Sequence, residues 1–188
     1  TTTPTASSGP NHYGVAANWS PSGVPVDADD IDLSGSSVSI LYDLDQSSVD
    51  PASLNIPASY TGKIGLPPYN PLGYYEYLPT TLTYRSTVVA DIGEGQGNGS
   101  SRIRLDVGDQ AACVCNIHAT GTPESSALPA LILSGGTGAS QLNVLKGSVG
   151  LAIEPESVAD FATIRVGSAG SQASDVTLLC GEGAVLDE

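Results

Sequence analysis

Few residues in this chain combine the type and the spacing that catalysis needs. The only histidines are His12 and His118, and no serine or cysteine sits in the Gly-x-Ser-x-Gly pattern of a nucleophile elbow. Cys115 and His118 share one segment three residues apart, which does not place a base beside a nucleophile. Glu154 and Glu156 could serve glycosidase chemistry, but 20 acidic residues make such pairs expected from composition alone. We therefore predict no catalytic residues and a protein that is not an enzyme.

Two segments partly resemble ligand-binding loops. Residues 27–32, Asp-Ala-Asp-Asp-Ile-Asp, resemble half of a calcium loop but lack the glycine and the distal glutamate of an EF-hand. Residues 93–99 have glycine at every second position, yet no βαβ unit contains them, as a dinucleotide-binding loop would require. A solvated acidic turn and a flexible corner between strands are the favoured interpretations. The sequence predicts no cofactor and no metal ion, with weak divalent binding at the acidic turn left open.

The three cysteines, Cys113, Cys115 and Cys180, are predicted to be free thiols. Cys113 and Cys115 are two apart on one strand face, and neighbouring residues on one face rarely form a good disulfide. Buried thiols that pack as small apolar side chains are favoured. A disulfide from either residue to Cys180 stays open, whereas a zinc site would lack its second pair of ligands.

Length and charge limit the expected partners. The chain has 188 residues, which suits one domain with a real core, and a formal net charge of −14 from 6 Lys and Arg against 20 Asp and Glu. Such a surface repels nucleic-acid phosphates and anionic lipids, so we expect neither nucleic acid nor a membrane as partner. The same charge resists aggregation of a sheet-rich protein that is displayed in many copies.

Residue types and turn signals predict an all-β protein. The apolar fraction is 40%, with no Met and one Phe and one Trp. β-Branched residues separated by many glycines favour short strands joined by tight turns. No run of a dozen residues has apolar positions at helical spacing without Pro or Gly.

The second half of the chain repeats itself. The order strand, glycine turn, strand, glycine turn, strand occurs three times between positions 89 and 186. Corresponding glycines, Gly135 with Gly167 and Gly147 with Gly181, recur at a period inside the range of roughly 20–50 residues that is typical of solenoids. Because the repeats contain no helices, we expect a right-handed parallel β-helix with three strands per coil. A β-sandwich is the alternative, although it would favour hairpins with two-residue turns.

In such a coil, each inward side chain stacks on the same side-chain type one coil along. The predicted columns are Ile92, Leu133 and Val166, and Val107, Leu145 and Leu179. A recurring glycine lets the chain turn each corner without a Cβ clash. No coil can bury its inner face alone, so we expect the N-terminal arm to cap one end and the coil at residues 184–188 to be unfinished.

The chain divides into an extended N-terminal arm, residues 1–25, and a β-helix domain, residues 26–188. The arm is rich in Thr, Ser, Pro and Gly and is expected to lie on another surface. Trp19 is its exception, either as a lid over the end of the core or as an anchor for a partner. A Pro- and Tyr-rich stretch, residues 67–79, predicts a protruding inserted loop, because prolines exclude a central strand.

Trp19 and the tyrosines of that loop are the predicted interface residues. The tyrosines are Tyr69, Tyr74, Tyr75 and Tyr77. Tyrosine offers amphipathic contact area at low entropic cost. Two interpretations stay open for the loop: it folds over the side of the β-helix, or it contacts a neighbouring subunit or sugar rings.

Several short stretches carry a further signal. They are Trp19 with Gly23-Val24-Pro25, Asp29-Asp30, residues 40–47 (Ile-Leu-Tyr-Asp-Leu-Asp-Gln-Ser), residues 59–67 (Ser-Tyr-Thr-Gly-Lys-Ile-Gly-Leu-Pro), residues 75–79 (Tyr-Glu-Tyr-Leu-Pro) and residues 91–95 (Asp-Ile-Gly-Glu-Gly). Together they resemble a group of β-helical proteins encoded by bacteriophages and some aquatic bacteria, over most of residues 19–181. These motifs are structural, so no catalytic residue is carried over. The resemblance implies a role at the surface of a virion or a cell.

The favoured function is therefore a phage virion structural protein, either a capsid decoration protein or a head or tail fibre module docked on the particle exterior. The expected partners are further copies of the chain, as a homotrimer, and the major capsid protein or another virion protein. A host surface glycan is a further candidate. The alternative is a secreted or cell-surface carbohydrate-binding protein or adhesin. A polysaccharide lyase or hydrolase has the support of fold analogy alone.

Overall fold

The computed structural model describes residues 11–67, 79–167 and 175–186. These residues form mostly short strands and one 3-10 turn. The elements are η1 (Ala16–Asn18), β1 (Asp30–Asp32), β2 (Asp45–Gln46), β3 (Ser53–Ile56), β4 (Leu82–Tyr84), β5 (Val89–Ile92), β6 (Ile103–Asp106), β7 (Val114–Ile117), β8 (Leu131–Val144), β9 (Gly147–Leu151), β10 (Ala159–Val166), β11 (Val176–Cys180) and β12 (Ala184–Leu186).

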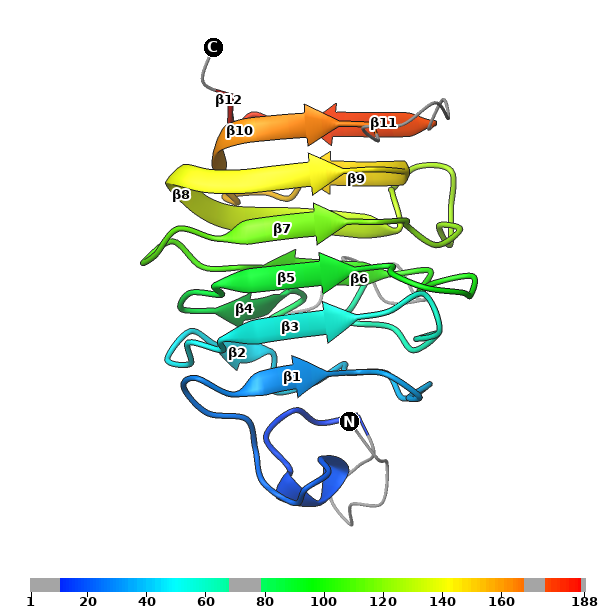
Figure 1. The fold of residues 1–188 in the computed structure, drawn as a ribbon, viewed down its shortest axis with the longest axis vertical. Coiled ribbons are helices and arrows are strands. Elements are labelled where there is room, and N and C mark those ends of the chain that lie inside the picture. Colours follow the sequence, from blue (N-terminus) through cyan, green and yellow to red (C-terminus); the bar gives the residue numbers. More distant parts are fainter. Residues whose placement is uncertain (1–10, 68–78, 168–174, 187–188) are drawn as a thin grey trace.

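The named strands pair in parallel and their coils stack along one axis (Figure 1). One face, the front sheet, contains β1, β3, β5, β7, residues 141–144 of β8 and residues 163–166 of β10. The opposite face, the back sheet, contains β2, β4, β6, residues 131–134 of β8, β9 and β11.

The direction of the strands gives the coil its hand. In Figure 1 the front strands run to the right and the back strands return to the left, while the chain climbs from its N-terminal end. This path is right-handed. The predicted parallel β-helix is confirmed, and the parallel pairing excludes the β-sandwich alternative, whose sheets are antiparallel.

The last coils add a third strand segment at the corner that follows the back sheet. Residues 135–137 of β8, residues 159–161 of β10 and β12 pair in parallel, one above another. These coils have the three segments that the sequence predicts. In the earlier coils the named strands lie in the front and back sheets, and the corner has single contacts such as the bridge between Ser86 and Gly108.

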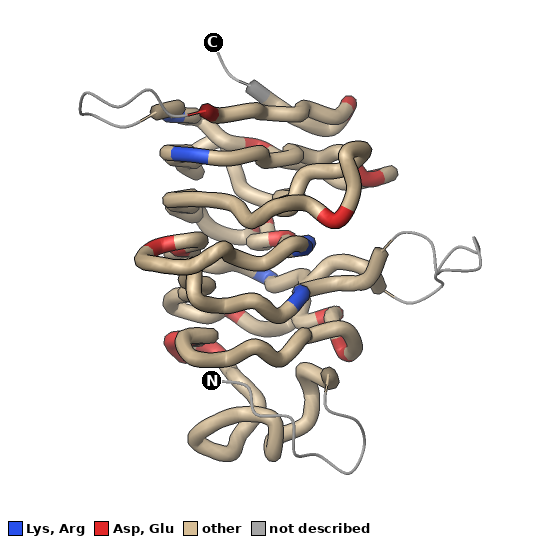
Figure 2. Tube along the Cα trace, turned by 90° about the vertical axis from the view of Figure 1, so that its right-hand side faces the viewer, with Lys and Arg blue, Asp and Glu red and all other residues tan. Residues whose placement is uncertain are grey.

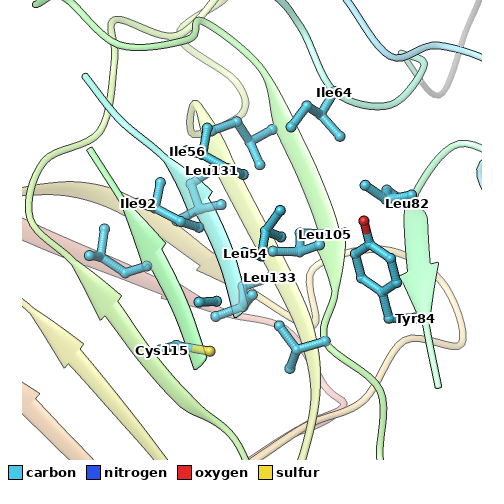
Figure 3. Packing of buried hydrophobic residues seen from close by; sticks show 14 of the residues in the cluster. Leu54, Ile56, Ile64, Leu82, Tyr84, Ile92, Leu105, Cys115, Leu131 and Leu133 are labelled. Carbon is cyan, nitrogen blue, oxygen red and sulfur yellow. The ribbon is translucent and has the colours of Figure 1, made fainter. Parts of the chain in front are cut away.

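The parallel register places apolar side chains above one another inside the coil (Figure 3). The front sheet has two inward columns: Ile56, Ile92, Ile117, Val144 and Val166, and Leu54, Ala90, Cys115, Leu142 and Ile164. The back sheet has Leu82, Leu105, Leu133, Leu151 and Cys180, and Ile103, Leu131, Val149 and Leu178. All members up to those in β8 and β9 are buried. Each large aliphatic side chain buried in this way contributes about 1.5–3 kcal/mol, so the columns hold the coils together.

The predicted register within this fold is wrong. Val166 pairs with Val144 rather than stacking on Leu133. Leu145 and Leu179 are not partners, because Leu145 lies in the turn after β8 and Leu179 is on the outward side of β11.

The error comes from the glycines on which the repeats were aligned. Gly167 follows a front strand and Gly135 follows a back strand, and both have positive φ. An alignment on glycine therefore superposes one sheet on the other. The true register partners Val114, Gln141 and Thr163 are closer together in the sequence than the aligned glycines are.

Residues 11–25 fold over the N-terminal end of the core (Figure 1). Tyr13 and Trp19 are buried, and their rings pack edge to face with centroids 4.9 Å apart. The Trp19 indole N–H donates to the Tyr13 carbonyl oxygen at 2.8 Å, and the Tyr13 N–H donates to the Tyr42 carbonyl oxygen at 3.0 Å. The described part of the arm is thus a cap on its own β-helix, with Trp19 as the lid.

Candidate functional site

The C-terminal end of the solenoid has no such lid among the described residues. Val166, Leu178 and Cys180 continue the inward columns by register. Yet Val166 is 55% exposed, whereas Val144, its partner one coil below, is 0% exposed. The side chains are of the same type, so the difference in exposure reflects that no described coil lies above Val166.

The same end presents unpaired strand edges. Among the described strands, residues 163–166 of β10 pair only with β8, β11 only with β9, and β12 only with β10. Free edges of this kind template the addition of another strand. The last coil also carries Arg165, Asp175 and Glu182, so an apolar floor is accompanied by charged groups, as in protein interfaces. We take this C-terminal end as the candidate functional site.

A polar ladder runs along the outer face of the front sheet. Its members share one register position: Asp32, Asn55, Asp91, Asn116, Asn143 and Arg165. Asn116 Nδ2 donates to Asp91 Oδ1 at 2.8 Å, and Asn143 Nδ2 donates to Asn116 Oδ1 at 2.8 Å. Arg165 Nη1 reaches Asn143 Oδ1 at 3.4 Å, so the ladder ends at the candidate site. This ladder was not predicted from the sequence, although each member stands between two inward apolar residues.

A polar groove of about 600 Å³ follows the corner between the back sheet and the third strand segments. Arg85, Asp106, Gln110 and Glu156 are among its lining residues. These come from several coils, so the groove runs along the solenoid. It offers hydrogen-bonding groups to an extended polar ligand, but Tyr84, which also lines it, is 1% exposed and presents no open ring face.

Asp106 is a half-buried carboxylate that lines this groove. Burial raises its pKa, although hydrogen bonds from the Gly108 N–H at 2.8 Å and from Ser134 act in the opposite direction. Glycine is needed opposite it, because a Cβ on Gly135 would stand 2.5 Å from Asp106 Oδ1.

Of the predicted interface residues, Trp19 is among those that the structure describes. Tyr69, Tyr74, Tyr75 and Tyr77 lie outside the described residues, so their role stays a prediction. Trp19 is 6% exposed and packs within its own chain, which corresponds to the lid rather than to an exposed anchor.

The acidic turn at residues 27–32 uses its carboxylates within the fold. Asp27 Oδ1 accepts from the Asp50 N–H at 3.0 Å, and Asp29 Oδ2 accepts from the Val26 N–H at 2.8 Å. In the part of the chain that the structure describes, no group of three or more His, Cys, Asp and Glu side chains is placed to hold a metal ion.

All three cysteines are free thiols. Cys113 and Cys115 are buried with their Sγ atoms 3.3 Å apart, and this hydrogen bond, together with burial, raises the pKa of Cys115 well above its ordinary value. Cys180 is exposed, unlike the buried thiol that the sequence predicts, because it lies at the uncovered end.

The acid–base candidates have separate partners. Glu154 pairs with Arg104 on the outer face of the back sheet, whereas Glu156 lines the groove. His118 Nε2 lies 3.7 Å from Asp91 Oδ1 on the front side.

Comparisons with known proteins give no match: no family model matches the chain, and neither a curated protein nor a solved structure does. Within residues 11–67, 79–167 and 175–186, no helix is long and apolar enough to cross a membrane.

Proposed function

We propose that this chain is a non-enzymatic structural module of a bacteriophage virion, docked on the particle exterior as a capsid decoration protein or as part of a head or tail fibre. The regular solenoid, the resemblance of its sequence motifs to phage β-helical proteins, and the acidic surface support this. Asp and Glu recur along the length of the solenoid, while Lys and Arg are few (Figure 2). A charge of −14 keeps many copies from aggregating on one particle.

The contrast between the two ends of the solenoid carries the proposal. Tyr13 and Trp19 close the N-terminal end. At the other end, Val166 is exposed, and residues 163–166 of β10, β11 and β12 each have one paired edge among the described strands. The occupant that we propose is a second copy of the chain, because two such edges can pair antiparallel about a two-fold axis and bring one apolar floor against the other. The capped N-terminal end of another copy cannot stack on this open end. We therefore favour a closed pair of chains over an open fibre of chains stacked end to end. The expected homotrimer stays a prediction.

Self-association of the purified chain tests the interface. Val166→Lys places a charge on the apolar floor and should weaken association at least tenfold. Val88→Lys is the matched control, since Val88 is 54% exposed but lies beside β5, in the middle of the solenoid. Sedimentation equilibrium measures both. The proposal is contradicted if the wild-type chain stays monomeric at high concentration or if the two variants associate equally. Either result would favour further coils of the same polypeptide as the cover of the C-terminal end.

The place of the protein on a virion needs a separate experiment. Mass spectrometry of virus-sized particles purified from the source of this sequence should find its peptides at a fixed ratio to the major capsid protein. Peptides found only in the particle-free fraction would remove the virion role while leaving the self-association result intact.

A carbohydrate-binding role is the second candidate, favoured by the groove that lies along the solenoid. Gln110 and Asp109 line it and can hydrogen-bond sugar hydroxyls. Binding on a glycan array that is lost in a Gln110→Ala, Asp109→Ala double variant would support this function. An array without binding removes it.

A further inference from the structure

Asn98 is the only asparagine in the sequence that is followed by a glycine. It is exposed and lies in the corner between β5 and β6. In an Asn-Gly pair, the backbone nitrogen of the glycine can attack the side-chain carbonyl carbon of the asparagine, because glycine has no Cβ to hinder the approach. Asn98 is therefore the asparagine whose following residue protects it least.

The corner that contains Asn98 is held between two neighbouring coils. The Ala58 N–H donates to the Glu94 carbonyl oxygen at 2.8 Å, and the Gly99 N–H donates to the Ala58 carbonyl oxygen at 2.9 Å. A Cβ on Gly97 would stand 2.0 Å from the Ala58 carbonyl oxygen, and a Cβ on Gly99 would stand 3.1 Å from the Gly121 nitrogen. Ala58 follows β3 in the coil below, and Gly121 follows β7 in the coil above. The backbone of this corner therefore has little room to change its length.

The hydrogen bond from Gly99 restrains the atom that would attack Asn98. That atom is the Gly99 backbone nitrogen, and it must lose its proton before it can form a new bond. In the folded corner the proton is donated to the Ala58 carbonyl oxygen, which also fixes the nitrogen against the neighbouring coil. An exposed reactive amide thus lies next to a nucleophile that the fold holds back.

We propose that Asn98 is a deamidation site that the hydrogen bond from Gly99 to Ala58 keeps closed, so that the reaction takes place when this corner opens. The opened Gly99 nitrogen gives its proton to solvent base and bonds to Asn98 Cγ. The side-chain nitrogen takes a proton from water and leaves as ammonia. Water then opens the cyclic succinimide at either carbonyl group and gives aspartate or isoaspartate.

The two products differ in their effect on the corner. Both replace a neutral amide by a carboxylate and add one negative charge. Only isoaspartate also lengthens the main chain by one methylene group. This modification of the chain does not depend on the proposed role in a virion.

The rate of conversion in the full chain, folded and unfolded, tests the hydrogen bond. Peptide mapping by mass spectrometry follows Asn98 in mildly alkaline buffer with and without guanidinium chloride. Conversion should be about tenfold or more slower in the folded chain, because the reaction draws only on the fraction of molecules whose corner is open. Equal rates in the two states overturn the control by the hydrogen bond, and no conversion in the unfolded chain overturns the site. Asn116, which isoleucine follows, is the internal control and should stay unmodified in both states.

A charge-matched variant separates the effect of the charge from that of the longer backbone. Asn98→Asp carries the charge of both products on an ordinary backbone, and it should melt at the wild-type temperature because the residue is exposed. Chains with isoaspartate, isolated from aged protein by ion exchange, should melt at a lower temperature, because the longer backbone does not fit between Ala58 and Gly121. Equal melting temperatures of the isoaspartate chains and the Asn98→Asp variant would contradict this effect of the longer backbone.

Discussion

The front and back sheets share one core but differ on their outer faces. Outside the front sheet, a ladder from Asp32 to Arg165 repeats coil by coil and reaches solvent. Outside the back sheet, the register partners Arg104 and Ile132 are 2% and 4% exposed. Glu154, from the loop after β9, pairs with Arg104, and Leu128 and Pro129 lie near Ile132. One outer face is repetitive and open, and the other is irregular and covered.

Because of this difference, the residues on the two outer faces are stabilised by different kinds of neighbours. An interior ladder residue has neighbours at the same position in both adjacent coils, and Asn116 is hydrogen-bonded to both, to Asp91 and to Asn143. On the covered face, Arg104 depends on one carboxylate, that of Glu154, which comes from the loop after β9 rather than from an adjacent rung. Loss of one residue should therefore be milder on the front sheet than on the back.

The largest effects are expected inside the coil, where the two sheets should behave alike. Leu142 faces inward from the front sheet and Leu133 from the back sheet, both 0% exposed. Truncating either to Ala should lower the free energy of unfolding by about 2–5 kcal/mol, because each leaves a cavity. Urea unfolding followed by circular dichroism measures both. Leu145→Ala, in a turn, is the control and should cost less; a cost equal to that of Leu133→Ala would contradict the register.

Matched arginine substitutions compare the outer faces directly. Arg104→Met leaves the Glu154 carboxylate without its ion-pair partner and should lower the free energy of unfolding by about 3 kcal/mol. This value is at the low end for a broken buried ion pair, because the Glu154 side chain is 19% exposed. Arg165→Met, at the exposed end of the ladder, should cost less than about 1 kcal/mol. The same urea titration reports both. Similar costs for the two variants would remove the distinction between the faces.

A rung of the ladder should have an intermediate effect. Asn116 donates to Asp91 and accepts from Asn143, so Asn116→Ala should cost about 1–2 kcal/mol from two hydrogen bonds. Asn98→Ala, in an exposed corner, should stay within about 0.5 kcal/mol of the wild type. Thermal unfolding resolves this difference. An Asn116 variant as stable as the Asn98 variant would show that the hydrogen bonds of the ladder do not stabilise the sheet.

The smallest effects are expected in the dependence of stability on pH, where the faces should have opposite signs. Burial acts to raise the pKa of Asp32, but hydrogen bonds from Ser34 and Asn55 prevail and lower it, whereas burial raises the pKa of Asp106. Asp32 therefore stabilises the fold above the ordinary carboxyl value of 3.8, and this contribution is lost as pH falls through its folded pKa. The contribution of Asp106 is present below 3.8 and is lost as pH rises through its folded pKa.

Two asparagine variants test these signs. At pH 7, Asp32→Asn should be less stable than the wild type and Asp106→Asn at least as stable, and both differences should shrink towards pH 3. Urea midpoints across this range give the comparison. A destabilised Asp106→Asn at pH 7 with an unchanged difference at pH 3 would contradict the effect of burial on that carboxyl group.

The fold could be predicted from the sequence because short strands bounded by glycine recur along the chain. The register could not be predicted from glycine, which marks corners on both faces. A better signal is a unit of apolar, polar and apolar residues, one in each front strand: Ile31-Asp32-Leu33, Leu54-Asn55-Ile56, Ala90-Asp91-Ile92, Cys115-Asn116-Ile117, Leu142-Asn143-Val144 and Ile164-Arg165-Val166. The middle residue is the ladder and its neighbours are the two inward columns.

The sites were less predictable than the fold. The strand at residues 184–186 was predicted from the sequence, and no described strand pairs with its outer edge. The groove along the solenoid has no local sequence signal, because its lining residues come from several coils. The lid role of Trp19 depends on Tyr13 and Tyr42, which the turn at η1 and the first coil bring together.

The cap at residues 11–25 bears on the order in which the molecule is made. It leaves the ribosome before the coils do, and β1 needs as its partner only β3, the next front strand along the chain. Short loops close at low entropic cost, so the capped end can form while the remainder is still being synthesised. Each later strand then meets a finished edge to pair with. In the monomeric chain, the last described coil has a neighbouring coil on one side only, so its amide hydrogens should exchange with solvent faster than those of the coils beneath it.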